Sequence, residues 1–393
     1  MFRIQTMNKI SPIGLSEFPQ GTYTVGDNVS EPHAILVRSA DLNNAAIAPS
    51  VLGIARAGAG YNNIPVAKCS DSGIVVFNTP GANANAVKEL ALAAMLIASR
   101  DIVGGINWAH TIAGKGAEVP DLVEKEKSKF EGGELRGKTL GVIGLGAIGS
   151  MVASAALALD MKVVGYDPAL TIEGAWNLSS QVRRAETLES LLGKSDYISI
   201  HVPLLDATKG LINSENLRLV KKDARILNLS RSGLVKDKDI VEALEAGRLG
   251  AYVTDFPTAE LLACKKVIPI PHLGASTPEA EENCAYMAAR QLVDYLETGT
   301  IINSVNFPRL RPDTQRTPVR LVLLSRGLDG AKLATQVGGK LGDAKVDNVI
   351  TVVGGDGYGA SVIDIASEPS PEVLDSINKL EGIVRVNVLK KPV

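Results

Sequence analysis

The sequence predicts an α/β protein: a doubly wound parallel sheet inserted into a second α/β domain, followed by a small α+β domain. Short apolar runs of strand type alternate with segments of helical spacing along most of the 393 residues, as in parallel sheets covered by helices. Two long helical stretches, roughly 84–107 and 276–298, bracket the central alternation. Residues 317–393 instead follow the order β-α-β-β-α-β, which is ferredoxin-like.

Composition limits the class of protein. Hydrophobic residues make up 45% and charged residues 21% of the chain, enough for two or three domains with cores of their own. A net charge of −2 gives no positive field for nucleic acid or an anionic membrane. The three cysteines lack the spacing of a disulfide framework or a metal site. The first residues resemble no signal peptide, and the longest apolar run, 90–98, is too short to span a bilayer. We expect a cytoplasmic protein without a metal ion.

The first predicted domain segment, 1–107, contains two strands that end on arginines. "HAILVRS" carries Arg38 and "VLGIARAGAGYNNI" carries Arg56. The turn "ARAGAGYNN" lacks a third glycine, and Asn78 stands where an acid would be needed, so we reject a dinucleotide site here.

The same segment has the groups of a small-anion site. Gly58 is expected to expose backbone N–H groups in the glycine turn, and Asn83 offers a side-chain amide. Guanidinium groups fit carboxylates and phosphates. We therefore predict a flavodoxin-like substrate domain, completed by a return segment at 276–316.

The central domain, 108–275, opens on the most informative motif. In "GKTLGVIGLGAIGSMVASAALALDMKVVGYDP" a strand leads into Gly144-x-Gly146-x-x-Gly149, then a helix, then a strand that ends on Asp167. The first glycine permits a tight turn, the second lets a pyrophosphate approach, and the third lets helix and strand pack closely. The helix directs free N–H groups at the phosphates. This predicts a Rossmann dinucleotide-binding domain.

Asp167 selects the dinucleotide. Its carboxylate can accept hydrogen bonds from the adenosine ribose hydroxyls. It would repel a 2′-phosphate, and no arginine follows in "YDPALTIEG". The predicted cofactor is NAD rather than NADP.

Three candidate catalytic residues follow later strands of the same domain. The expected strands are 195–204, 224–230, 250–256 and 267–273. Arg231, Asp255 and His272 lie at or just past three of their carboxyl ends. Ligands of doubly wound sheets bind at this edge.

Five segments together resemble one family. "RAGAGYNNIPV", "VFNTPGANANAVKEL", "LGVIGLGAIG", "NLSRSGLV" and "PHLGASTPEAEENC" are similar to the D-isomer-specific 2-hydroxyacid dehydrogenases. The resemblance implies NAD-dependent oxidation of a secondary alcohol to a ketone, with substrate in a cleft between the two domains. His272 matches the family base, which suits a ring that titrates near neutral pH. Arg231 matches the arginine that binds the substrate carboxylate and polarises the reacting oxygen.

The carboxylate that orients the histidine stays open between two residues. An ungapped match places Ala259 where relatives carry glutamate, which leaves Asp255 and Glu260 as candidates. We favour Asp255 because it stands at a strand end; its other possible role is contact with the nicotinamide amide.

The resemblance also assigns the remaining ligand contacts. NAD contacts fall on Gly144, Gly146, Ala147, Ile148, Asp167, Val202, Pro203, Leu229, Ser230, Arg231, Asp255, His272, Gly274 and Ala275. Substrate contacts fall on Arg38, Arg56, Gly58, Ala59, Asn83, Arg231 and His272. The two N-terminal arginines favour a phosphorylated 2-hydroxy acid. Two alternatives are a relative acting on glyoxylate, hydroxypyruvate or D-lactate, and a non-catalytic NAD-sensing interaction protein.

The tail, 317–393, resembles an ACT domain, a module that often pairs edge to edge and binds amino acids. Serine-sensitive relatives carry an Asn-x-Pro-Gly type turn after the first strand. Here the loop is "LLSRGLDGAKL", with neither Asn nor Pro and with Arg326 and Asp329 present. We expect a structural or dimerising role, weak or absent serine binding, and a homo-oligomer, either dimer or tetramer.

Overall fold

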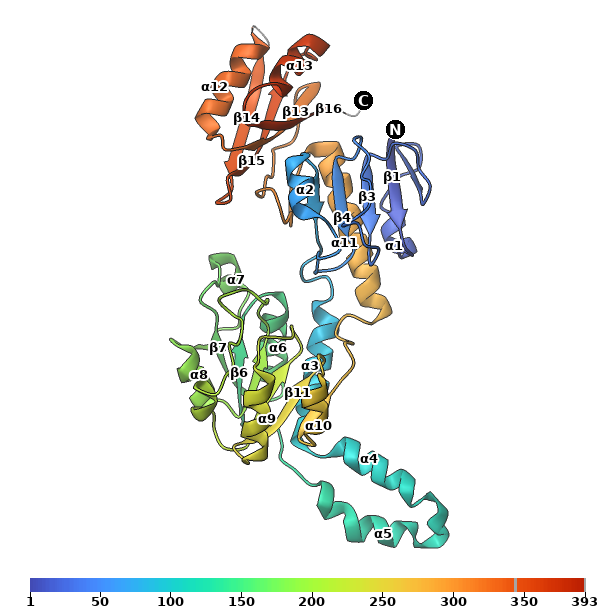
Figure 1. Cartoon of the computed structure of the whole chain (residues 1–393), viewed down its shortest axis with the longest axis vertical. Helices are drawn as coiled ribbons and strands as arrows, with labels where there is room; N and C mark the ends of the chain where they lie inside the picture. The colour runs from blue at the N-terminus through green and yellow to red at the C-terminus, as the bar shows by residue number, and fades with distance from the viewer. Residues whose placement is uncertain (343–344, 392–393) are drawn as a thin grey trace. The chain divides into compact units, whose positions relative to one another are not determined.

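The chain folds into two compact units. The computed structural model describes residues 1–342 and 345–391; residues 343–344 and 392–393, part of the predicted tail domain, lie outside the described residues. Unit 1 comprises Met1–Asn83 and Pro278–Val393, and unit 2 comprises Ala84–Thr277. Figure 1 shows the elements of both units.

The first sheet of unit 1 is flavodoxin-like, as predicted. Its strands are parallel and run in the order β2-β1-β3-β4-β5, the order 2-1-3-4-5 of flavodoxin-like sheets. Their bounds are β1 Phe2–Met7, β2 Tyr23–Gly26, β3 Ala34–Val37, β4 Gly53–Arg56 and β5 Val75–Phe77. The helices are α1 Pro12–Leu15, α2 Val66–Asp71 and α11 Pro278–Thr298. α11 returns the chain to this sheet and buries Ala285, Leu292 and Tyr295 in the sheet's core.

Unit 2 contains the doubly wound parallel sheet. The strand order is β12-β11-β10-β9-β6-β7-β8, and all neighbours pair in parallel. The strands are β6 Thr139–Ile143, β7 Lys162–Tyr166, β8 Arg183–Arg184, β9 Tyr197–Ile200, β10 Ala224–Asn228, β11 Leu249–Thr254 and β12 Val267–Pro269. The main helices are α3 Ala84–Ser99, α6 Ala147–Ala158, α7 Ile172–Trp176, α8 Leu188–Lys194, α9 Asp237–Glu245 and α10 Ala259–Ala263, with the short η3 Asn216–Arg218.

The units divide at different residues from those the sequence indicated. Helix α3 belongs to unit 2, whereas the segment 1–107 placed it in the substrate domain. Its buried Ala91, Ala94 and Met95 share a core with Leu140 on β6. A helical apolar face does not reveal which of two sheets covers it, so sequence spacing alone misassigned this helix.

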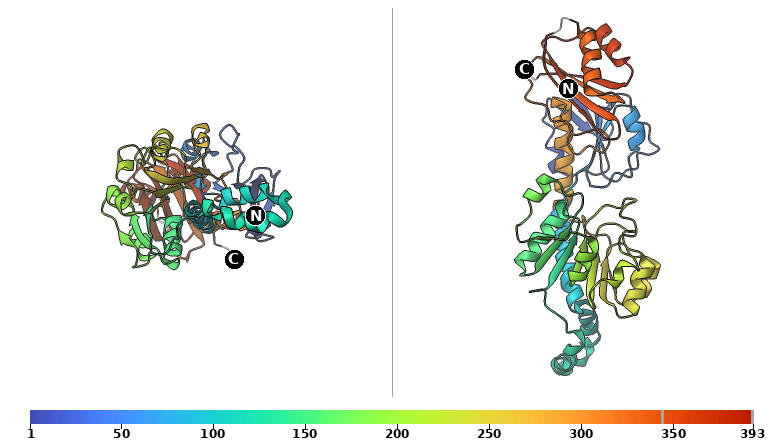
Figure 2. Two further views of the ribbon diagram at one scale, coloured as in Figure 1. Left: turned by 90° about the horizontal axis from the view of Figure 1, so that it is seen from below. Right: turned by 90° about the vertical axis from the view of Figure 1, so that its left-hand side faces the viewer.

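Residues 100–136 form a helical arm of unit 2, where the sequence suggested a solvated connection in its charged part. Its elements are α4 Ile102–Thr111, η1 Ala113–Glu118, α5 Val119–Glu126 and η2 Lys127–Phe130. The rings of Trp108 and Phe130 lie 5.5 Å apart and hold the two halves of the arm together. α4 and α5 have no buried residue, and the arm extends away from the unit 2 sheet (Figure 2).

The tail confirms the predicted ferredoxin-like order. Its elements are β13 Val319–Arg326, α12 Gly330–Leu341, β14 Val346–Val353, β15 Tyr358–Ile365, α13 Pro371–Asn378 and β16 Ile383–Lys390. The antiparallel order is β14-β15-β13-β16. One face of this sheet packs on α12 and α13. The other face places Val322 and Leu324 in the core that contains α11.

No helix within residues 1–342 and 345–391 is long and apolar enough to cross a membrane. The cysteines Cys69, Cys264 and Cys284 are free and buried.

Candidate active site

The glycine turn of unit 2 has the shape that a dinucleotide needs. Gly144 has φ +89°, and a Cβ there would lie 2.6 Å from the His201 carbonyl oxygen. A Cβ on Gly149 would lie 1.9 Å from the Gly144 carbonyl oxygen, so helix α6 can pack on the turn only without a side chain. A Cβ on Gly146 would meet nothing within 4 Å. That open space lies at the N-terminus of α6, which has no side-chain cap and so offers N–H groups to an anion.

Asp167 stands at the end of β7 with a fixed carboxylate. One oxygen accepts a hydrogen bond from the Leu145 N–H at 2.8 Å, and the other from the Ala169 N–H at 2.9 Å. Each carboxylate oxygen can accept more than one bond. The group is therefore held beside the glycine turn with capacity left for ribose hydroxyls, and the turn and this acid fit NAD.

Asp255 is a buried acidic residue of unit 2. It lies directly after β11 and is 2% exposed, yet neither side-chain oxygen has a hydrogen-bond partner among the described residues. Burial raises the pKa of this carboxyl, while the nearby charges of His272 and Arg231 and its own backbone N–H oppose the rise. A buried carboxylate of this kind is costly unless another group pairs with it.

His272 and Arg231 face Asp255 from neighbouring strand ends. His272 follows β12 and is exposed; its ring lies 4.7 Å from the ring of Phe256, centroid to centroid. Arg231 follows β10 and is exposed, and its Nη1 donates to the Ser230 carbonyl oxygen at 2.7 Å. The three candidate catalytic residues thus share one region of the sheet edge.

Glu260, the alternative acid, is in a different environment from Asp255. It occupies the first turn of α10 and is exposed. The charges of His272 and Arg231 both act on the carboxyl of the buried Asp255 and lower its pKa.

The remaining NAD candidates occupy the same edge with different exposures. Ser230 donates from Oγ to the Ile200 carbonyl oxygen at 2.6 Å, joining the ends of β10 and β9. A Cβ on Gly274 would lie 3.7 Å from Asp255 Oδ2. Leu229 is buried, Val202, Ala275 and Ile148 are partly buried, and Ala147 and Pro203 are exposed. Ile148 packs on the core under α6, so only its backbone suits a cofactor contact.

Unit 1 orients Arg56 at the end of β4. Its Nε donates to Asn63 Oδ1 at 3.1 Å. A Cβ on Gly58 would lie 2.1 Å from Arg56 Nη1, so the guanidinium fills space that only glycine leaves free. The Ala59 carbonyl accepts from Asn78 Nδ2 at 2.6 Å. Asn63 was not singled out in the sequence, because a local asparagine gives no signal of such a role.

Arg38 has a partner that the sequence could not indicate. Its Nη2 contacts Glu281 Oε1 at 2.5 Å, and both side chains are about two-fifths exposed, at 41% and 44%. Ion pairs at such exposure contribute little, so an anionic ligand can compete with Glu281. The pair joins positions 243 residues apart in the chain.

Unit 1 contains three further polar groups of interest. Asn83 Oδ1 and Thr79 Oγ1 are buried and have no hydrogen-bond partner within the part of the chain that the structure describes. Cys284 on α11 is buried, and burial raises the pKa of its thiol, while the nearby Thr79 hydroxyl and the charges of Arg56 and Arg38 oppose the rise. Cys284 therefore belongs with the arginine region.

The comparison with family models matches residues 92–274. The model is described as D-isomer specific 2-hydroxyacid dehydrogenase, NAD binding domain. The match contains the glycine turn, Asp167, Asp255 and His272.

Curated relatives carry the name D-3-phosphoglycerate dehydrogenase. The protein of Methanocaldococcus jannaschii is 37% identical over 65% of this chain and 48% of its own length. That of Synechocystis sp. is 36% identical over 84% of this chain and 58% of its own length. The Bacillus subtilis protein is 33% identical over 80% and 60%. The chain spans about half to three-fifths of the length of these relatives.

Solved structures share the fold. The NAD+-bound 3-phosphoglycerate dehydrogenase of Entamoeba histolytica is 26% identical, with a TM-score of 0.59, over 79% of this chain and 99% of that one. The apo D-mandelate dehydrogenase of Rhodotorula graminis, at 23% identity and a TM-score of 0.65 over 79% and 99%, supports the fold alone. The glycine turn, the acid at the end of β7 and these matches agree: residues 92–274 are similar to the NAD-binding domain of the D-isomer specific 2-hydroxyacid dehydrogenases.

Proposed function

We propose that the chain oxidises D-3-phosphoglycerate to 3-phosphohydroxypyruvate with NAD, the first step of the phosphorylated route to L-serine. The observation that carries the proposal is the buried Asp255 carboxylate without a hydrogen-bond partner, beside His272 and Arg231 at the carboxyl ends of the sheet. Perturbed carboxyl groups in contact with a titratable base mark functional sites more often than structural ones. The names of the curated relatives support the substrate.

His272 is the base in this proposal. It takes the proton of the substrate hydroxyl, which leaves the oxygen free to form the ketone. Asp255 stabilises the protonated ring that results and fixes its orientation. NAD, when bound, supplies the acceptor for the hydride that leaves the same carbon.

Arg231 binds the substrate carboxylate and polarises the reacting oxygen. A guanidinium offers two parallel N–H donors to a carboxylate, which holds the reacting carbon in one position. The charge that develops on the oxygen is also stabilised by this cation.

Arg38 and Arg56 recognise the phosphate end of the substrate in this proposal, with Gly58, Ala59 and Asn83 beside them. Phosphate needs cations with geometry that fits its oxygens. Arg56 is oriented by its hydrogen bond to Asn63. When the substrate binds, Arg38 gives up its ion pair with Glu281 and pairs with the phosphate instead. Substrates without the phosphate would lose these contacts, which is why we place glyoxylate, hydroxypyruvate and D-lactate behind D-3-phosphoglycerate.

We propose a homo-oligomer, dimer or tetramer, acting in the cytoplasm, with the tail as an ACT-like module of structural or dimerising role. The remaining NAD contacts predicted from the sequence, among them Leu229, Ser230, Gly274 and Ala275, are part of the same proposal.

Replacing His272 by alanine tests the chemistry directly. We expect the turnover number with D-3-phosphoglycerate to fall by roughly 10²–10⁴, because proton transfer loses its base. The affinity for NAD, measured by the quenching of protein fluorescence, should change little. The matched control is His110→Ala, an exposed histidine on α4, which should keep wild-type turnover. Near wild-type turnover in the His272→Ala enzyme would remove the histidine from the mechanism.

A further inference from the structure

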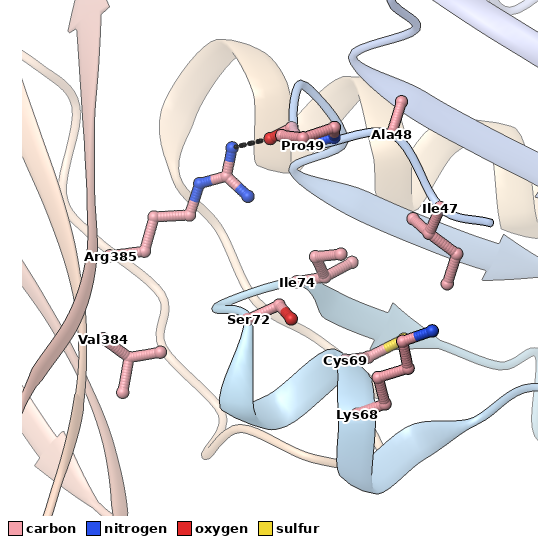
Figure 3. Close-up of a pocket in the computed structure, with 9 residues that line it drawn as sticks. All are labelled: Ile47, Ala48, Pro49, Lys68, Cys69, Ser72, Ile74, Val384 and Arg385. Carbon is pink, nitrogen blue, oxygen red and sulfur yellow. Dashed lines mark hydrogen bonds between the residues drawn. The ribbon is translucent and has the colours of Figure 1, made fainter.

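A cavity of about 360 Å³ lies within unit 1, between the tail and the flavodoxin-like sheet. Val384 and Arg385 extend into it from β16, and Ile47, Lys68, Ser72 and Ile74 line the opposite wall (Figure 3). Its size lies at the lower end of the range for sites that enclose small molecules, about 300–1,000 Å³. None of its residues belongs to the NAD or substrate candidates described above.

Fixed contacts hold the two walls together. Arg385 donates from Nη1 to the Val51 carbonyl oxygen at 2.6 Å and from Nη2 to the Pro49 carbonyl oxygen at 2.9 Å. A Cβ on Gly73 would lie 2.5 Å from Arg385 Cβ, and Gly73 has φ +63°. The strand β16 and the turn after α2 thus approach as closely as a glycine allows, and the cavity is preformed.

The charge in the cavity is positive and uncompensated. Arg385 bonds only to neutral carbonyl groups in these contacts, which leave its charge in place. Lys68 is exposed and has no carboxylate partner among the ion pairs of the described residues. The nearest acid in sequence, Asp71, already contacts Arg326 at 3.0 Å and the Tyr358 hydroxyl at 3.2 Å.

The rest of the lining adds no negative charge. The buried Cys69 thiol at the cavity wall stays protonated at neutral pH, because burial raises its pKa to about 11. Ser72 contributes a hydroxyl, and Ile47, Ile74 and Val384 contribute apolar surface. A ligand that fits must combine one negative charge with a short apolar body.

We propose that this cavity is a binding site for a short-chain aliphatic carboxylate, held by Lys68 and Arg385 with its alkyl group against Ile47, Ile74 and Val384. Charge-assisted hydrogen bonds to the carboxylate satisfy both cations. An amino acid is excluded as the preferred ligand, because its ammonium group would enter a cationic cavity without a counter-charge. The ligand contacts both the tail and the first sheet, so its binding stabilises the docked arrangement of the two.

Isothermal titration of the full chain tests the site with 3-methylbutanoate as the probe. We expect saturable binding, weakened about fivefold or more by Lys68→Met, which removes one charged donor. Lys340→Met, an exposed lysine on α12, should leave the affinity unchanged. L-valine, which is the same skeleton with an added ammonium group, and 3-methylbutanol, which lacks the charge, should bind at least about tenfold more weakly.

Two results would overturn the assignment. Absence of saturable binding of 3-methylbutanoate at millimolar concentrations would show that the cavity takes no such anion. Equal affinity of 3-methylbutanoate for the wild-type and Lys68→Met proteins would show that the carboxylate binds at another site. The region of Arg38 and Arg56 would be the first such site to test. Because Lys68 belongs to no catalytic group, D-3-phosphoglycerate turnover in the Lys68→Met protein also shows that the variant is folded.

Discussion

At the scale of single residues, Asp255 distinguishes this site from an ordinary sheet edge. A carboxylate that is 2% exposed normally has hydrogen-bond partners, since an unpaired buried charge is costly. In the described ranges 1–342 and 345–391, neither oxygen of Asp255 has one. The proposed role of Asp255 explains this cost, because the carboxylate is held ready for the imidazolium that forms when His272 takes a proton. Glu260, exposed on α10, has no such constraint.

The two acids can be separated by their effect on the pH dependence of turnover. A carboxylate beside His272 stabilises the protonated ring, and protonation switches off a base. Removing it in Asp255→Asn should therefore move the acidic limb of the kcat profile to lower pH and reduce the plateau. The companion variant Glu260→Gln should leave the limb in place. If only Glu260→Gln moves the limb, Asp255 is not the partner and its role is contact with the cofactor.

At the scale of elements, the strand-turn-helix from β6 to β7 was predictable because its requirements are local. Gly144, Gly146 and Gly149 each meet a steric demand that fixed spacing reveals, and Asp167 ends the next strand. The arm of α4 and α5 was not predictable, since its mixed charges are typical of a solvated connection. The pairing of Arg38 with Glu281 was hidden too, because it depends on how α11 returns to the sheet.

The position of Asp167 at the end of β7 leads to a prediction about the preference for NAD over NADP. Its carboxylate is fixed by the N–H groups of Leu145 and Ala169 and cannot turn away from a 2′-phosphate. We expect kcat/KM for NAD to exceed that for NADP at least about tenfold, a difference of about 1.4 kcal/mol. Steady-state assays with each dinucleotide measure it, and Asp167→Asn should narrow the gap. Equal kcat/KM for NAD and NADP in the wild-type protein would show that Asp167 does not discriminate between the two dinucleotides.

The loop between β13 and α12 predicts the response to L-serine. Arg326 contacts Asp71 at 3.0 Å, and Asp329 caps α12 by accepting from the Lys332 N–H at 2.7 Å. Both side chains are thus engaged within the chain, and the loop offers no asparagine amide to an amino acid. Titrating L-serine into the dehydrogenase assay should give weak or no inhibition. Half-inhibition at micromolar serine would mean that this loop forms the effector pocket after all.

At the scale of the whole molecule, the candidate residues are divided between the two units. Unit 2 carries the glycine turn, Arg231, Asp255 and His272, and unit 1 carries Arg38 and Arg56. Within unit 1, the buried Arg320 links the tail to α11: it is held by two bonds to Asp364 of the tail at 2.7 and 2.8 Å, and it donates to the Thr298 carbonyl oxygen at the end of α11 at 2.9 Å. The sequence indicated the tail's own fold but not this anchoring, because it depends on contacts between distant segments.

The formation of NADH by the purified chain, followed with a panel of 2-hydroxy acids, distinguishes a D-3-phosphoglycerate dehydrogenase from the alternative functions. With D-3-phosphoglycerate we expect sustained NADH formation. Its kcat/KM should be at least about tenfold above those for D-glycerate, glycolate and D-lactate, because only the phosphorylated acid has a phosphate to pair with Arg38 and Arg56. Preference for an unphosphorylated acid would support the dehydrogenase activity but contradict the proposal that D-3-phosphoglycerate is the substrate. Absence of NADH with every acid, in a protein that still binds NAD, would contradict the enzyme itself and leave an NAD-sensing interaction protein.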